Sequence, residues 1–156
     1  MACWLMKSEP EEFSIDDLAA VAREPWTGVR NYQARNFMRD AMRVGDKVLF
    51  YHSNCAVPGV VGVARVASAP YPDPTQFDPQ SDYFDPKSSP EKPRWQLVDI
   101  AFERKLARTI SLAELREPAA ELGDFQLLAR GNRLSVLPLT RQQFDTILAL
   151  LRADPT

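Results

Sequence analysis

Three polar residues follow directly on the first apolar segment of the chain. Lys7, Ser8 and Glu9 place an ammonium, a hydroxyl and a carboxylate side by side, where residues 2–7 predict a short buried strand. Together these groups supply donors and acceptors that could recognise the hydrogen-bonding edge of a small flat ligand. The simpler interpretation is an ordinary strand end with a Lys–Glu surface pair, and the three residues alone favour it.

A second candidate segment combines aromatic and basic side chains. Trp26 and Tyr32 lie in an irregular stretch, and Arg35, Arg39 and Arg43 then recur every four residues. Residues 30–47 hold five basic and two acidic residues, a net charge of +3. Guanidinium groups match phosphate oxygens, and aromatic rings among arginines suit the stacking of bases. The alternatives are a solvated arginine face and a Trp26 that belongs to the core, and for Trp26 the two interpretations are evenly balanced.

No enzyme or metal motif stands out. The chain has no phosphate-binding P-loop, no GxSxG and no GxGxxG. The lone His52 and its neighbour Ser53 lie in a predicted strand, where adjacent side chains point to opposite faces, so a structural histidine is favoured over a nucleophile pair. Cys3 and Cys55 form no CxxC pair, and no cluster of His or Cys supplies metal ligands. We therefore predict no catalytic residue, no metal and no cofactor.

Length and charge limit the possible partners. A chain of 156 residues, 45% hydrophobic and 26% charged, predicts one globular domain over residues 1–156. The net charge of −2 excludes a global electrostatic attraction to nucleic acid, so any such site must be a local patch.

The compartment is predicted from segments that the chain lacks. No apolar run approaches the roughly 20 residues of a membrane span, and the N-terminus does not resemble a signal peptide. Both cysteines lie beside apolar residues, which predicts buried free thiols in a reducing compartment. We expect a cytoplasmic protein with no membrane partner.

The predicted elements form an α+β domain. Strands are expected at residues 2–7, 47–53, 59–67, 95–107 and 133–138, and helices at 15–21, 33–43, after a capping box at 111–114, weakly at 119–130, and from 141 onward. Residues 70–93 carry seven of the thirteen prolines and predict a long loop without strand or helix. The aromatic residues of this loop suggest that it packs onto the body, and a loop of this length is often functional. Strands in a hairpin followed by a long strand, with helices at the edges, indicate a small barrel.

These segments together resemble a known family, the EVE domain. The resemblance runs in order from about residue 3 to 151, and it is carried by the segments WLMKSEP (4–10), WTGVRNYQARNF (26–37), VGDKVLFYHSN (44–54), YFDPKS (83–88) and RLSV (133–136). It implies a PUA-like fold, a small mixed β-barrel with flanking helices, related to the YTH domain that recognises methylated adenine in RNA with an aromatic cage. It also implies recognition of a modified base, chiefly 5-methyl- or 5-hydroxymethylcytosine in DNA.

The resemblance also implies a site. Lys7, Ser8 and Trp26 match a pattern shared with YTH domains, whereas Glu9 stands where that family tends to have an amide. A carboxylate only accepts hydrogen bonds, so Glu9 favours a base that presents an amine, as cytosine does. The predicted base-binding pocket comprises Lys7, Ser8, Glu9, Trp26, Val29, Arg30, Asn31, Tyr32, Ser53 and Trp95, and the predicted phosphate contacts are Arg30, Arg35 and Arg39, with Lys7.

Within that pocket we expect Trp26 to stack on an extruded base, with Tyr32 or Trp95 as a second wall. Stacking returns roughly 1–3 kcal/mol against an extrusion cost of a few kcal/mol, so binding should be weak and salt-dependent. Three alternatives stay open: a hydrolase of modified nucleosides on a related ASCH-type barrel, with Lys7 and Glu9 as reacting groups; a reader of modified RNA; and a protein-interaction module built on residues 70–93. A monomer is expected.

Overall fold

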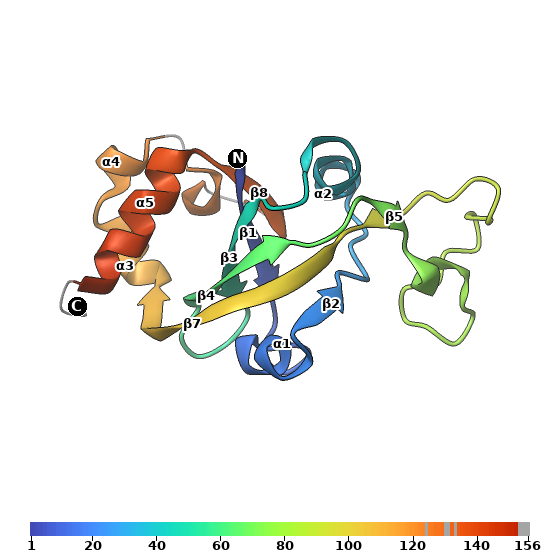
Figure 1. Ribbon diagram of the computed structural model, residues 1–156, viewed down its shortest axis with the longest axis horizontal. Helices are drawn as coiled ribbons and strands as arrows, with labels where there is room; N and C mark the ends of the chain where they lie inside the picture. Colours follow the sequence, from blue (N-terminus) through green and yellow to red (C-terminus); the bar gives the residue numbers. More distant parts are fainter. Residues whose placement is uncertain (124, 130–131, 133, 153–156) are drawn as a thin grey trace.

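A six-stranded sheet in the order β2-β7-β4-β3-β1-β8 forms the body of the protein, seen in a computed structural model that describes residues 1–123, 125–129, 132 and 134–152 (Figure 1). The strands are β1 Cys3–Ser8, β2 Arg23–Pro25, β3 Lys47–His52, β4 Gly59–Val66, β7 Asp99–Ser111 and β8 Val136–Leu139. A separate pair, β5 Tyr71–Pro72 and β6 Gln96–Leu97, is antiparallel.

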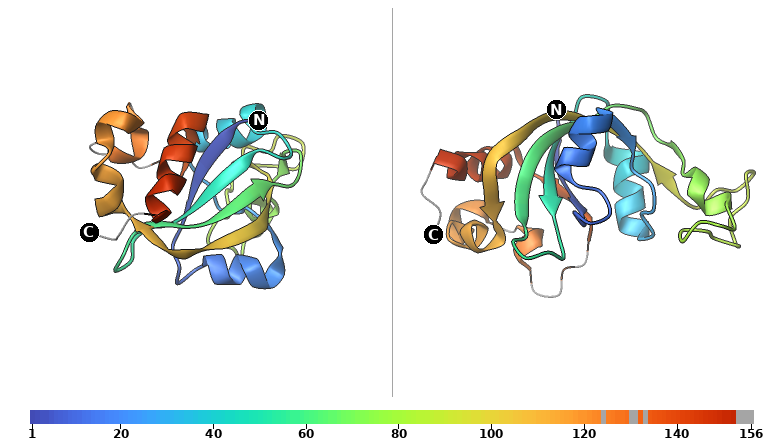
Figure 2. Two further views of the ribbon diagram at one scale, coloured as in Figure 1. Left: turned by 60° about the vertical axis from the view of Figure 1, so that its left-hand side comes forward. Right: turned by 90° about the horizontal axis from the view of Figure 1, so that it is seen from below.

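The sheet is mixed and strongly curled. β1 and β3 run parallel, while every other neighbouring pair is antiparallel. Register shifts between Phe50 and Tyr51, and between Val60 and Gly62, bend the strands and increase their twist. The result is an open, barrel-like sheet with helices on its flanks (Figure 2), which confirms the predicted α+β, PUA-like class.

Apolar residues fill two clusters, one on each face of the sheet. In β1, Trp4 and Met6 belong to one cluster, whereas Cys3 and Leu5 belong to the other, as the alternation of a strand requires. Helices cover both faces: α1 Ile15–Val21, α2 Tyr32–Asn36 and the π-helix η1 Phe37–Ala41 lie against the first cluster, and α3 Leu112–Arg116, α4 Ala119–Leu122 and α5 Arg141–Ala149 against the second. Short 3-10 turns are η2 Pro74–Phe77, η3 Gln126–Leu128 and η4 Leu150–Arg152.

The helix predictions are confirmed where a cap marks the start. Helix α1 begins and ends as expected, and the Ser14–Asp17 capping box holds its first turn. The helix expected over residues 33–43 is instead α2 followed by one π-helical turn, in which Met42 N–H donates to the Phe37 carbonyl at 2.9 Å. The wider turn breaks the four-residue row on which the predicted arginine stripe rested.

The strand predictions are right for β3 and β4 and differ from the structure in other parts of the sheet. β3 and β4 lie within the expected segments, but the strand expected over 95–107 is two strands, of which β7 continues to residue 111. The short edge strand β2 was not expected. Pro138 lies inside β8 rather than ending it, because β8 is an edge strand where a missing amide hydrogen is tolerated.

Residues 70–93 extend beyond one end of the sheet and are held there by buried polar groups (Figure 1). The segment contains β5 and η2, so the prediction of a loop without strand or helix is wrong. The fully buried Gln76 donates to the Asp73 and Trp95 carbonyls and accepts from the Trp95 N–H. These bonds fix the segment against the body, as its aromatic residues suggested.

Parts of two predictions lie outside the described residues. These are residues 124 and 130 of the weak helix over 119–130, and residue 133 of the strand over 133–138.

Both thiols are free, but only Cys3 is buried; Cys55 is half-buried. No helix in the described part of the chain is long and apolar enough to cross a membrane. No group of His, Cys, Asp or Glu in that part could hold a metal ion.

Candidate functional site

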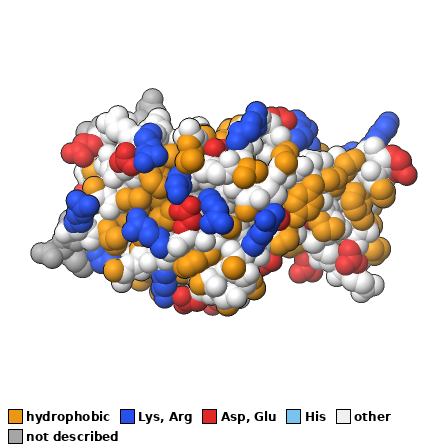
Figure 3. Space-filling view, in the orientation of Figure 1, with side chains coloured by type: hydrophobic (Ala, Val, Ile, Leu, Met, Phe, Trp, Pro, Cys, Tyr) orange, Lys and Arg blue, Asp and Glu red, His pale blue; other side chains and the backbone are white. Residues whose placement is uncertain are grey.

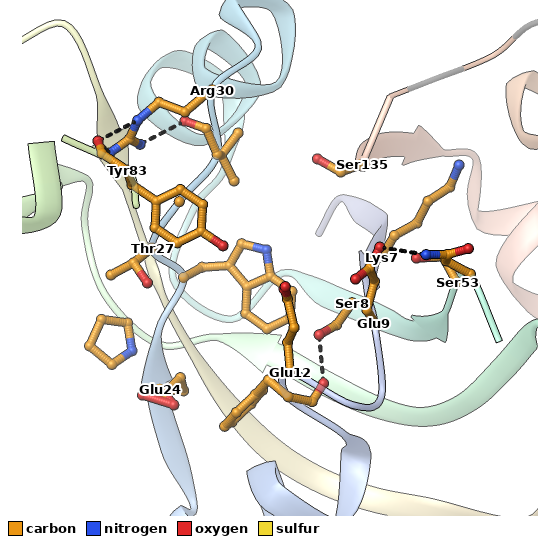
Figure 4. Close-up of a pocket in the computed structure, with 16 residues that line it drawn as sticks. Lys7, Ser8, Glu9, Glu12, Glu24, Thr27, Arg30, Ser53, Tyr83 and Ser135 are labelled. Carbon is orange, nitrogen blue, oxygen red and sulfur yellow. Dashed lines mark hydrogen bonds between the residues drawn. The ribbon is translucent and has the colours of Figure 1, made fainter. Parts of the chain in front are cut away.

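A cavity of about 820 Å³ opens where the parallel strands β1 and β3 end (Figure 4). Sixteen residues from five segments line it: Lys7, Ser8, Glu9, Glu12, Phe13, Glu24, Pro25, Trp26, Thr27, Gly28, Val29, Arg30, Ser53, Asn54, Tyr83 and Ser135. Such a volume is within the usual range for small-ligand sites. The polar ends of two strands therefore meet the irregular segment after β2 at one concave site.

Trp26 belongs both to the core and to the cavity. It is 8% exposed and packs edge-on against Phe50 and Phe13, with ring centroids at 5.6 and 6.4 Å. No described residue accepts a hydrogen bond from its indole N–H. The indole N–H groups of Trp4 and Trp95, in contrast, donate to Asp46 and Asp85. The Trp26 N–H is not fully buried, so it is open to the cavity.

Tyr83 supplies the exposed aromatic ring of the cavity. The residue is 38% exposed, and its ring lies directly over Gly28, where a Cβ would come within 2.7 Å of it. Gly28 has φ +85, a conformation that side chains other than glycine rarely adopt. The Arg30 guanidinium donates to the Tyr83 carbonyl at 2.7 Å and lies 5.6 Å from the ring (Figure 4).

The buried Asp73 holds this corner of the cavity together. One of its oxygens accepts from Gly28 N–H at 2.8 Å and from Arg30 Nη1 at 3.1 Å, and the other accepts from Thr75 Oγ1 at 2.6 Å. Burial alone would raise the pKa of Asp73, but the bonds from Thr75, Gly28 and Arg30 outweigh it and lower the pKa below its ordinary value. The proline-rich segment is therefore anchored to the Gly28–Arg30 turn by a charged carboxylate.

The strand-end residues present hydrogen-bond acceptors and the ammonium group of Lys7. Ser8 Oγ donates to the Phe13 carbonyl, so the hydroxyl offers lone pairs, and Glu9 accepts from Asn54 Nδ2 at 3.0 Å through one oxygen. The Lys7 ammonium has no hydrogen-bond or ion-pair partner among the described residues, and burial lowers its pKa. Its side chain points away from Tyr83 (Figure 4), and its Nζ lies 6.0 Å from the centre of the Tyr51 ring.

Carboxylates outnumber cations around the cavity. Glu9, Glu12 and Glu24 face two cations, Lys7 and Arg30, and the charge of Arg30 is balanced by Asp73. Burial, and then the nearby charge of Asp99, raises the pKa of Glu24. Such a cavity accepts hydrogen bonds from an amine-bearing guest and disfavours a phosphate.

Seven of the ten residues expected in a base-binding pocket line the cavity: Lys7, Ser8, Glu9, Trp26, Val29, Arg30 and Ser53. Three do not. Asn31 caps α2 by accepting from Ala34 N–H at 3.0 Å, because the helix begins at Tyr32. Tyr32 and Trp95 stack on each other outside the cavity, with centroids at 4.8 Å and planes at 20°, so neither is its second wall. The Tyr83 ring lines the cavity in their place.

The predicted phosphate-contacting arginines are dispersed. Arg30 lines the cavity; Arg35 lies outside it and donates to the Arg94 carbonyl at 2.7 Å. Arg39 pairs with its neighbour Asp40 at 2.7 Å. Basic side chains are scattered singly over the face in Figure 3 rather than gathered in one patch.

His52 has a structural role. Its Nε2 accepts from Ile15 N–H at 3.1 Å, which joins the end of β3 to the start of α1. His52 does not line the cavity, whereas the neighbouring Ser53 does, as strand alternation predicts.

A curled mixed sheet with a polar and aromatic cavity at the ends of its parallel strands defines a small binding domain of the PUA-like class. Residues 2–150 match the EVE domain, and the chain belongs to that family. Thymocyte nuclear protein 1 of Danio rerio is 45% identical over 170 residues, which is 97% of this chain and 73% of the relative.

Solved structures agree with this assignment. The human THYN1 protein, in complex with 5-methylcytosine containing DNA, superposes with a TM-score of 0.94 at 42% identity, covering 99% of this chain and all of the other. A Pseudomonas putida protein superposes at 0.93 with 49% identity, over 96% and 99% of the two chains. A Zymomonas mobilis ASCH protein, at 13% identity and a TM-score of 0.53 over 95% and 97% of the chains, shares the fold alone.

Proposed function

We propose that this domain binds a modified cytosine, 5-methylcytosine or 5-hydroxymethylcytosine, in DNA, and that binding leaves the base chemically unchanged. The base enters the cavity after leaving its strand. The flanking phosphates stay outside, near Arg30 and Arg35.

The observation that carries the proposal is the chemistry of the cavity in a chain so similar to the DNA-bound human protein. One side offers the Tyr83 ring, and the other offers the free oxygen of Glu9 and the lone pairs of Ser8. The Trp26 N–H is a donor without an acceptor in the described protein. Cytosine presents the complement, an exocyclic amine beside ring acceptors.

The roles follow from these positions. Tyr83 stacks on the face of the base in place of Trp26, whose ring is only 8% exposed and packs against Phe50 and Phe13. Glu9 accepts from the amine of the base, and the Trp26 N–H donates to a ring acceptor. The excess of carboxylates makes the cavity suited to the base rather than the backbone. A methyl group that fills an apolar spot adds about 0.8 kcal/mol, which is roughly a fourfold preference over plain cytosine.

The test is a binding titration with short single-stranded and duplex DNA that carries one cytosine, 5-methylcytosine or 5-hydroxymethylcytosine. The wild-type protein should prefer a modified base by a few-fold. Glu9→Gln should weaken binding of the modified strand by about tenfold or more, because an amide N–H₂ replaces a charged acceptor. Glu11→Gln is the matched control, since Glu11 is exposed, outside the cavity, and loses the same charge.

Two results would contradict the proposal. One is equal binding of modified and plain cytosine. The other is equal behaviour of the Glu9 and Glu11 variants. Recovery of the modified nucleoside intact after incubation with the protein supports binding without turnover, and its conversion would show an enzyme instead.

A further inference from the structure

Tyr32 presents an exposed aromatic ring just outside the cavity. The residue is 51% exposed, although tyrosine rings are usually more covered. One face of the ring stacks on Trp95, which is only 6% exposed and is fixed by an indole bond to Asp85 at 2.7 Å. The ring of Tyr32 is thus held rigidly while part of it faces solvent.

A series of neighbouring rings and guanidinium groups joins this ring to the cavity. The Arg30 guanidinium, which lines the cavity, lies 5.6 Å from the Tyr83 ring and 5.3 Å from the Trp95 ring. Tyr32 then covers Trp95. The Arg35 guanidinium lies 4.7 Å from the Tyr32 ring and 5.9 Å from the Trp95 ring, so it sits beside the stacked pair and leaves the outer face of Tyr32 open. We call Tyr32, Trp95 and Arg35 the Tyr32 platform.

The charge of the platform is opposite to that of the cavity. The described part of the chain provides no carboxylate partner for Arg35, whose donors go to the Arg94 carbonyl and the Asn36 amide oxygen. The cavity, in contrast, holds three carboxylates and two cations. A DNA strand is complementary to both regions, because an amine-bearing base can donate to the carboxylates of the cavity and a phosphate can accept from Arg35.

We propose that the Tyr32 platform stacks an unpaired base next to the one in the cavity, so that the domain holds at least two nucleotides of single-stranded DNA. This rests on the proposed function for the first base, but the stacking itself is indifferent to the modification. Stacking on an aromatic ring tolerates any base, since every base has a π face. The measured contribution of such contacts is about 1–3 kcal/mol per base, or roughly 5- to 150-fold in affinity.

The test compares Tyr32→Ala with Tyr32→Phe on three ligands. The ligands are a short single strand with one 5-methylcytosine, the same strand with abasic sites on both sides of it, and the free mononucleotide of 5-methyldeoxycytidine. Tyr32→Ala should weaken the intact strand by roughly 5- to 150-fold and leave the other two ligands unchanged. Tyr32→Phe keeps the ring and should bind like the wild type.

A purely structural role of Tyr32 predicts a different pattern. Tyr32 is the first residue of α2, so damage to the turn before it would weaken the mononucleotide as much as the strand. That result, or an unchanged affinity of Tyr32→Ala for the intact strand, overturns the platform. A strand affinity that depends on Tyr32 but not on methylation would retain the platform and refute the proposed function, so the two failures are distinguishable.

Discussion

Replacing Gly28 with alanine tests whether Tyr83 is a wall of the binding site. Gly28 combines two constraints: φ is +85, and a Cβ would lie 2.7 Å from the Tyr83 ring. Gly45 also has a positive φ, of +95, but a Cβ there would meet no close neighbour, since the nearest atom would be Met1 Cε at 3.8 Å. Gly45→Ala is therefore a matched control for backbone strain.

The two substitutions should cost similar stability but differ in binding. A non-glycine residue at positive φ costs on the order of 1–3 kcal/mol in the free energy of unfolding. The Tyr83 ring is partly exposed, so it can swing outward when the new methyl group meets it. Its stacking on the base is then lost, which weakens the modified strand by about 1–3 kcal/mol, or roughly 5- to 150-fold.

Urea unfolding measures the loss of stability, and a fluorescence titration with 5-methylcytosine DNA measures the loss of affinity. We expect Gly45→Ala to bind like the wild type, and Gly28→Ala to bind as weakly as Tyr83→Ala. The double variant Gly28→Ala with Tyr83→Ala should be no weaker than either single one, since both remove the same contact. Normal binding by Gly28→Ala, or additive losses in the double variant, would refute the assignment of Tyr83.

Three further predictions concern the anchoring groups and the ionic contacts. Asp73→Ala should lower the free energy of unfolding in urea by about 3–5 kcal/mol, because the half-buried Arg30 loses its carboxylate; a loss below about 1 kcal/mol would contradict the role of Asp73. Burial lowers the pKa of His52, so the unfolded chain takes up a proton near pH 6.5 that the folded chain resists, and the melting temperature should fall from pH 7.5 to 5.5. His52→Gln should flatten that fall, and an unchanged pH dependence would show that His52 does not cause it. Raising salt from 50 to 200 mM should weaken single-strand binding only about 3- to 7-fold, as for about one or two phosphate contacts, and a much steeper loss would indicate a broad basic surface.

Local sequence rules predict the elements that position one half of the site. The capping box at Ser14 marks the start of α1, and the polar residues Lys7, Ser8 and Glu9 mark the end of β1. Because β1 and β3 run parallel, their ends meet, and Ser53 comes to the same cavity. The two strands and their polar ends follow from local patterns, whereas their parallel pairing is a long-range contact that the structure supplies.

The other half of the site depends on contacts that local patterns do not contain. Tyr83 reaches the cavity only because the proline-rich segment is bonded to Gly28 and Arg30 through Asp73. The aromatic residues of that segment indicate packing, but not against which residue. Tyr32 stands outside the cavity for a local reason, since the helix there begins one residue earlier than its pattern predicts.

The most direct test of the central claim follows the three tryptophan indole N–H signals by ¹H–¹⁵N NMR while a single strand with one 5-methylcytosine is added. Trp4 is the internal reference, because its N–H donates to the buried Asp46 at 3.0 Å, in the core rather than in the cavity. The account predicts that the Trp26 signal shifts to saturation, further with 5-methylcytosine than with cytosine at equal concentration, while Trp4 stays in place. A strand that binds without moving the Trp26 signal would contradict the account.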